Sequence, residues 1–357
     1  MRFIFKTDYA QDLRLAKHGG HLFWYGLLGL LLLAAPWWSS EYVMSQLHFI
    51  CIYSIVGFGL MILTGFTGQV SLGHAAFLAV GAYTEALMQA AGVPFAISIS
   101  CAAIFSAIAG IVIGLPALRL KGIYLAIATL AFGVVVEEII TRWTKLTGGN
   151  EGKHLKPVEI LGWKLESDAE FYYLCLALTV LCCLACINLL RSPTGRAFVA
   201  IRDSEISASC MGVNLAKYKT MAFAISAALT GVGGALYAHK LAFISPEQFT
   251  LFQSIELLTI VILGGIGFLH GAVLGAAFII VLPQLISIGK GWLPEGMAPS
   301  GLQAVVFGLI LILFIIFEPL GLYGRWLKVR TYFELFPFYR KGMFRRQKSY
   351  MKSERLR

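Results

Sequence analysis

The sequence predicts an all-α, polytopic membrane protein with about ten transmembrane helices. Hydrophobic residues make up 58% of the 357 residues and charged residues only 13%, and the mean hydropathy is +0.76. Apolar runs of about 20 residues, the length that crosses a bilayer core of roughly 30 Å, recur along the whole chain. The polar stretches between them are too short to form a soluble domain of ordinary size.

Ten expected spans follow from these runs, with boundaries uncertain by about three residues. They are 22–38, 46–64, 71–90, 94–116, 122–140, 171–190, 220–240, 254–269, 271–289 and 301–323. The basic residues predict the orientation, because Lys and Arg are retained on the cytoplasmic side of a membrane. When both termini are placed in the cytoplasm, 22 of the 29 Lys and Arg residues lie in cytoplasmic segments.

This topology divides the chain into three regions. A cytoplasmic N-terminal segment covers 1–21, a transmembrane domain covers 22–323, and a basic cytoplasmic tail covers 324–357. The charge of +10 does not indicate a nucleic-acid partner, because much of it lies in the tail, where it suits an anionic lipid surface. The basic start and the long first apolar run, without a small-x-small cleavage site, predict an uncleaved first span.

One segment between two apolar runs is unusually polar and glycine-rich. It reads Gly65-Phe66-Thr67-Gly68-Gln69-Val70-Ser71-Leu72-Gly73-His74-Ala75-Ala76-Phe77. Backbone that bends inside a bilayer must be shielded by protein or line a wet cavity, because lipid cannot satisfy its freed N–H and C=O groups. We therefore expect Gln69, Ser71 and His74 to face a translocation path. The alternative is that these residues and the glycines serve only helix packing.

The polar segment 191–219 predicts two short helices beneath the membrane. Ser192, which precedes a proline, is typical of a helix start. Asp203 or Ser204 can cap a second helix, which Gly212 would end. An ordered amphipathic segment of this kind favours docking of a cytoplasmic partner over a plain linker.

The sequence lacks the motifs that are typical of other functional classes. The run Gly148–Lys153 is one residue shorter than a phosphate-binding loop and lacks the Ser or Thr after its Lys, so we expect no ATP binding. The cluster Cys182-Cys183-x-x-Cys186 has no further ligand nearby, so we expect packing and no metal site. No motif of an intramembrane enzyme appears. An ion-coupled carrier needs an ionisable residue near the midplane, and His74 is its only candidate.

Several motifs, taken in chain order, resemble the permease subunits of bacterial ABC importers for branched-chain amino acids, of the LivM type. They are Gly68–Phe77, Leu120–Gly133, Leu146–Gly149, Ser192–Ala197, Ala200–Glu205 and Gly264–Gly267. The resemblance runs from about residue 40 to 325. Importers of urea or short amides have closely similar permeases, so they stay as the alternative for the substrate.

The resemblance implies an ABC-importer permease fold in the bacterial inner membrane, and it implies partners. These are a sister permease, two cytoplasmic ATPases that bind ATP and Mg²⁺, and a periplasmic binding protein that delivers the substrate. This chain would bind no cofactor and would not be an enzyme. It also implies that 196–212 couples to an ATPase, with family positions at Arg196, Arg202, Asp203, Glu205 and Gly212. The loop around 148–152 would face the binding protein.

Overall fold

The computed structural model describes residues 19–120, 122–160, 163–165, 167–290, 302–318 and 320–335. In these ranges the chain is predominantly helical, and each of the ten expected spans overlaps at least one helix. The expected N-terminal segment up to residue 18 and the expected tail beyond residue 335 lie outside the described residues.

The helices that overlap the ten expected spans differ in length and burial. They are α2 (Gly19–Trp38), α3 (Glu41–Leu60) with a π-helix η1 (Met61–Phe66), α4 (His74–Ala90), α5 (Phe95–Ala117), α6 (Ile123–Arg142), α8 (Asp168–Arg191), α11 (Leu215–Leu241), α12 (Leu251–Gly264), α13 (Leu269–Lys290) and α14 (Leu302–Phe317). Within the described residues, seven helical segments are long and apolar enough to cross a membrane. The chain is therefore a polytopic helical membrane protein.

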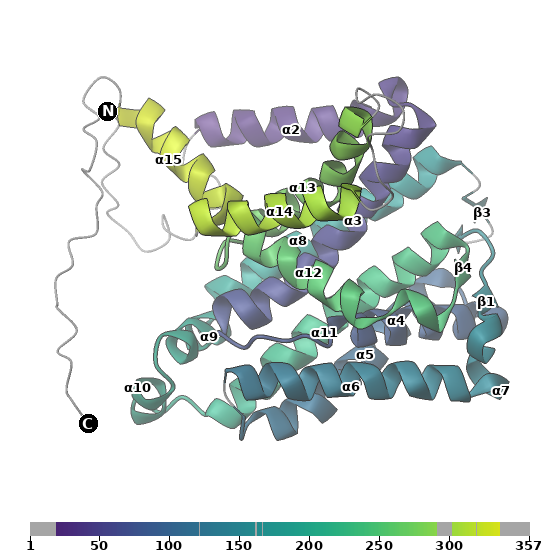
Figure 1. Cartoon of the computed structure of the whole chain (residues 1–357), viewed down its shortest axis with the longest axis horizontal. Helices are drawn as coiled ribbons and strands as arrows, with labels where there is room; N and C mark the ends of the chain where they lie inside the picture. Colours follow the sequence, from purple (N-terminus) through teal and green to yellow (C-terminus); the bar gives the residue numbers. More distant parts are fainter. Residues whose placement is uncertain are drawn as a thin grey trace.

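Helices α3 and α11 form the centre of the bundle (Figure 1). In the most apolar window of each helix, 83% of the α3–η1 residues and 67% of the α11 residues are buried, against 22% for α5 and for α8. The outer helices therefore direct most of their apolar side chains away from the protein, as lipid-facing helices do.

Glycines bring α4 into close contact with α11. A Cβ atom built on Gly81 would lie 2.3 Å from the Gly231 carbonyl oxygen, and one on Gly234 would lie 2.2 Å from the Leu78 carbonyl oxygen. Small residues allow such backbone approach in membrane proteins. Gly73 packs against α6 and not α11: a Cβ atom built on it would lie 2.1 Å from the carbonyl oxygen of Thr129.

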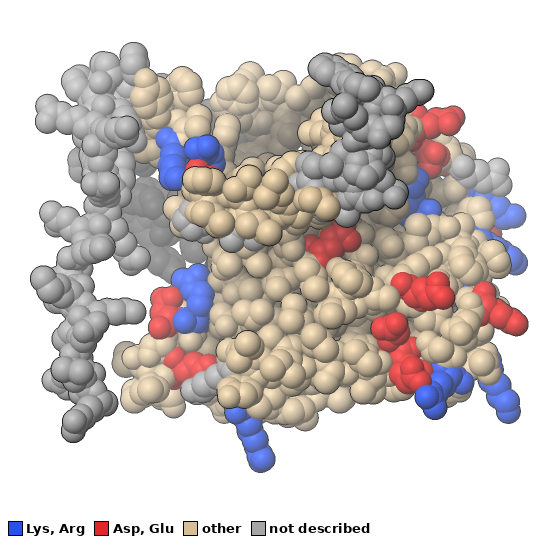
Figure 2. Space-filling model, viewed as in Figure 1, with Lys and Arg blue, Asp and Glu red and all other residues tan. Residues whose placement is uncertain are grey.

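The two ends of the bundle carry different structures. At one end, α9 (Pro193–Asp203) and α10 (Glu205–Cys210) form a helical hairpin that leads into α11. At the other end lie α7 (Thr144–Thr147), the 3₁₀ turns η2 (Gly149–Glu151) and η3 (Pro246–Gln248), and four short strands, β1 (Lys153–His154), β2 (Glu159–Ile160), β3 (Trp163–Lys164) and β4 (Phe243–Ile244). We call these the α9–α10 end and the β1–β4 end; most charged side chains on the face in Figure 2 lie towards one or the other.

Two pairs of short strands and the position of one helix were not predicted from the sequence. β1 pairs antiparallel with β4, and β2 pairs with β3, so small ladders accompany the expected all-α fold. Strands of two residues are too short to carry a recognisable alternation of polar and apolar residues. Helix α15 (Gly321–Leu335) runs across the expected boundary at residue 323.

Candidate translocation and coupling site

The chain leaves helical geometry between α3 and α4, inside the bundle. The side chain of Thr67 donates to the Ile62 carbonyl oxygen at 2.7 Å, and the backbone N–H of Gln69 donates to the Leu63 carbonyl oxygen at 3.0 Å. Gly68 takes a φ of +74°, which favours glycine. The break is therefore stabilised within the protein, as the expected bend inside a membrane requires.

His74 begins α4 and is fully buried. Its Nδ1 lies 2.9 Å from the Ser71 hydroxyl, and its Nε2 lies 2.8 Å from the hydroxyl of Ser226 on α11. Both ring nitrogens therefore have partners. The structure brings Ser71 and His74 together in a polar contact that joins the start of α4 to the middle of α11.

Gln69 differs from these two residues. Its side chain is only 5% exposed, yet neither its amide nitrogen nor its amide oxygen has a hydrogen-bond partner among the described residues. Leaving a buried polar group unpaired costs about 1–3 kcal/mol. Of the three expected path residues, Gln69 is therefore the one whose side-chain polar atoms have no hydrogen-bond partner among the described residues.

Hydroxyl groups on other helices complete this site. Thr129 of α6 accepts a hydrogen bond from the Leu72 N–H at 2.9 Å, and Ser254 of α12 accepts one from the Ala75 N–H at 3.0 Å. The sequence analysis did not single out these residues or Ser226. Their only signal in the sequence is a hydroxyl within an apolar run, which many packing residues share.

At the α9–α10 end, the local predictions for 191–219 are confirmed. Ser192 caps α9 by accepting from the Gly195 N–H at 3.4 Å, and Ser204 caps α10 by accepting from the Ser207 N–H at 3.2 Å. Gly212 takes a φ of +83° just after α10. Between the two helices lies an open groove of about 380 Å³, which is lined by Ala200, Asp203, Ser204, Ser207, Ala208, Met211 and Val213.

Arg202 connects α9 to the break before α4. Its Nη1 donates to the Gly65 carbonyl oxygen at 3.2 Å, and its Nε and Nη2 each lie 3.1 Å from Oδ1 of Asp203. A Cβ atom built on Gly68 would lie 3.2 Å from the Arg202 Cγ, and one on Gly267 would lie 3.3 Å from its Nη1. Arg202 therefore lies where the glycine-rich segment Gly65–Phe77 meets the motif Gly264–Gly267.

Glu205 connects α10 to the beginning of α11. Its Oε1 accepts a hydrogen bond from the Lys219 Nζ at 2.7 Å, and the Lys219 side chain is only 4% exposed. A buried ammonium group needs such a partner, because breaking a buried ion pair is strongly destabilising. Arg196, by contrast, is exposed and donates to the carbonyl oxygen of Arg191, away from the other expected coupling residues.

The fold and this site define a class: a multi-pass helical membrane protein with a broken polar segment in its core and an ordered hairpin at one end. The family described as "Branched-chain amino acid transport system / permease component" matches residues 42–315. The chain belongs to this family.

Curated relatives carry the same description. The high-affinity branched-chain amino acid transport system permease proteins LivM of Salmonella typhimurium and Escherichia coli are each 34% identical over 323 residues, covering 83% of this chain and 74% of the relative. The probable branched-chain amino acid transport permease protein LivM of Methanocaldococcus jannaschii is 28% identical over 236 residues, covering 62% and 67%. No solved structure matches the chain.

Proposed function

We propose that this chain is the transmembrane permease subunit of an ATP-driven importer that carries leucine, isoleucine and valine. The family match over residues 42–315 is the observation that carries the proposal. The names of the LivM relatives supply the substrate. In this proposal the chain forms the translocation path and catalyses no reaction itself.

The proposed assembly contains three kinds of partner and lies in the bacterial inner membrane. A sister permease completes the path, two ATPases bind ATP and Mg²⁺ in the cytoplasm, and a periplasmic binding protein delivers the substrate. The chain crosses the membrane ten times with both termini in the cytoplasm. The region 22–323 is then the permease domain, flanked by a cytoplasmic segment at 1–21 and a basic tail at 324–357.

In this orientation the α9–α10 hairpin, within 191–219, is the coupling segment. Closure of the ATPases displaces the hairpin, and two contacts carry the displacement into the bundle. Arg202 transmits it to the Gly65 carbonyl at the break, and Glu205 transmits it through Lys219 to α11. Asp203 orients Arg202, Gly212 ends the hairpin, and Arg196 faces the ATPase surface.

The path runs past the break between α3 and α4. Support for this position comes from the buried amide of Gln69, which has no hydrogen-bond partner among the described residues and has both a donor and an acceptor to offer. Ser71 and His74 hold the wall of the path, because Ser71 contacts His74 and His74 contacts Ser226. Selection of the substrate belongs to the binding protein, so the path needs only a few polar groups.

The deciding experiment is gentle purification of a tagged copy from its native membranes, followed by mass spectrometry and reconstitution into liposomes. We expect two ATPases and a second permease to copurify, and we expect leucine uptake that depends on ATP and on the binding protein. Uptake of urea or acetamide in place of leucine would reassign the substrate to the alternative importer class. A chain that is recovered alone and transports leucine with an ion gradient would replace the importer by a secondary carrier.

A further inference from the structure

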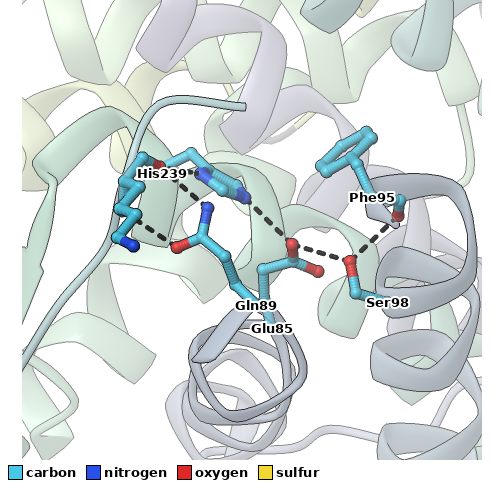
Figure 3. A network of polar contacts seen from close by, with 6 residues as sticks. Glu85, Gln89, Phe95, Ser98 and His239 are labelled. Carbon is cyan, nitrogen blue, oxygen red and sulfur yellow. Dashed lines mark hydrogen bonds and ion pairs between the residues drawn. The ribbon is translucent and has the colours of Figure 1, made fainter. Parts of the chain in front are cut away.

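A buried polar network lies at the β1–β4 end, well away from the break. Oε1 of Glu85 on α4 lies 2.9 Å from Nε2 of His239 on α11, and it accepts a hydrogen bond from Ser98 on α5 at 2.8 Å (Figure 3). The side chains of Glu85 and His239 are only 1% and 2% exposed. Three helices therefore meet at one carboxylate.

The same network holds the loop that leads into α8. Gln89, one turn beyond Glu85, donates from Nε2 to the Lys156 carbonyl oxygen and accepts from the Lys156 N–H, both at 2.9 Å. Nδ1 of His239 lies 3.2 Å from the same carbonyl oxygen. Figure 3 shows the side chains of His239 and Gln89 converging on this point. His239 therefore touches the loop with one ring nitrogen and Glu85 with the other.

The loop is also fixed independently of this network. Lys153 and His154 in β1 pair with β4, and the Leu155 N–H donates to the Ala242 carbonyl oxygen at 2.8 Å. Loss of the contact between Glu85 and His239 would thus leave the loop attached. Gln89 would still join the loop to α4, so what this loss removes is the polar connection between His239 of α11 and Glu85 of α4.

Helix α11 links this network to the site described above. From one end to the other, its Lys219 contacts α10, its Ser226 contacts the start of α4, and its His239 contacts Glu85 further along α4. The helix has 27 residues and is therefore about 40 Å long. Next to His239, Lys240 lies 3.5 Å from Asp168 of α8, so the end of α11 is held from a second side.

We infer that Glu85 and His239 form a latch that transmits docking of the loaded binding protein from the loop around Lys156 to α4 and α11. The inference rests on the proposed function. A buried ionisable pair is a costly way to pack two helices, since an apolar pair of similar volume is often equally or more stable. In addition, Oε2 of Glu85 is buried without a hydrogen-bond partner among the described residues. The pair therefore costs stability that packing alone does not require.

The test uses the complete assembly in liposomes and measures ATP hydrolysis against the concentration of leucine-loaded binding protein. Glu85→Gln removes the charge with little change in shape. We expect it to leave basal hydrolysis unchanged and to lower the maximal stimulation at least fivefold, which is at the lower end of typical coupling between sites. The concentration for half-maximal stimulation should change by less than about twofold, because the loop stays attached. Gln89→Ala should show the opposite pattern, with a higher half-maximal concentration.

A double variant separates a latch from mere packing. Glu85→Leu combined with His239→Leu replaces the pair by apolar side chains, so we expect it to restore thermal stability without restoring the stimulation. Glu247→Gln, the same change at an exposed site on the same end, is the matched control and should behave as wild type.

Stimulation of Glu85→Gln within twofold of the wild-type value would overturn the latch. Recovery of stimulation in the double-leucine variant would also overturn it. If the wild-type assembly is not stimulated by any loaded binding protein, the proposed function itself fails. This failure is seen in the wild-type assembly alone, so it can be told apart from failure of the latch, which is seen only in the variants.

Discussion

At the scale of single residues, the site combines satisfied and unsatisfied polar groups. His74 has a partner for each ring nitrogen, whereas the amide of Gln69 has none among the described residues. A polar group left unpaired in the core lowers stability. Its presence beside the break therefore indicates a use other than packing.

We predict that Gln69→Leu raises the melting temperature of the detergent-solubilised assembly and slows leucine uptake. Leucine fills a similar volume and removes the cost of the unpaired amide, about 1–3 kcal/mol, while depriving the path of its donor and acceptor. The measurement is uptake per assembled complex together with a thermal melt. Gln46→Leu, the same change at a half-buried position near the start of α3, is the control. Normal uptake by the Gln69 variant would show that this residue serves only helix packing.

Local sequence rules predicted some residue roles and missed others. The caps at Ser192 and Ser204 involve partners three residues away, so the sequence pattern was sufficient to predict them. Ser226 lies 152 residues from His74, and a single sequence carries no signal for such a pair. The same holds for Glu85, whose partner His239 is 154 residues away.

At the scale of elements, the α9–α10 hairpin is joined to the bundle by two polar contacts of different kinds. Arg202 contacts the backbone at the break, and Glu205 contacts a buried lysine on α11. The hairpin is therefore connected both to the wall of the proposed path and to the central helix.

We predict that Arg202→Gln reduces substrate-driven ATP hydrolysis and uptake by about tenfold or more while the assembly remains intact. The variant loses the charged donor to the Gly65 carbonyl, and hydrogen bonds of charged groups contribute about 1.5–3 kcal/mol. Hydrolysis and uptake in the reconstituted assembly are the measurements. Lys217→Gln, an exposed change in the same segment, should leave both rates unchanged. Wild-type rates in the Arg202 variant would remove the coupling role of this arginine.

Helix positions were predictable because a membrane span has a required length and an apolar composition. Every expected span overlaps a helix, although α3 and α11 begin at Glu41 and Leu215, five residues earlier than expected. These first turns contain charged or polar residues, which a hydropathy criterion assigns to the flanks. The two-residue strands and α7 were missed because they are shorter than any periodic pattern.

At the scale of the whole molecule, the charge distribution predicts the orientation of the chain in the membrane. The structure offers an exposed cysteine with which this orientation can be tested. Of the seven cysteines, Cys210 is the exposed one, and it lies at the end of α10. The other six are buried or half-buried. A single thiol therefore marks the α9–α10 end.

We predict that a membrane-impermeant maleimide labels Cys210 only from the cytoplasmic side. In right-side-out cells the reagent should not react with this residue, whereas in inverted vesicles it should react rapidly. Cys210→Ser combined with Lys164→Cys, at an exposed position on β3, should give the reverse pattern. Labelling of Cys210 in intact cells would reverse the proposed topology.

The close packing of α4 on α11 has a mechanical consequence. Backbones that approach this closely at Gly81 and Gly234 resist sliding past each other, so we expect α4 and α11 to tilt together as one lever. A lever about 40 Å long that tilts by about 10° shifts its far end by roughly 7 Å. Packed helices are separated by about 8–10 Å. A small stroke at one membrane face therefore suffices to open a gap of molecular size at the other.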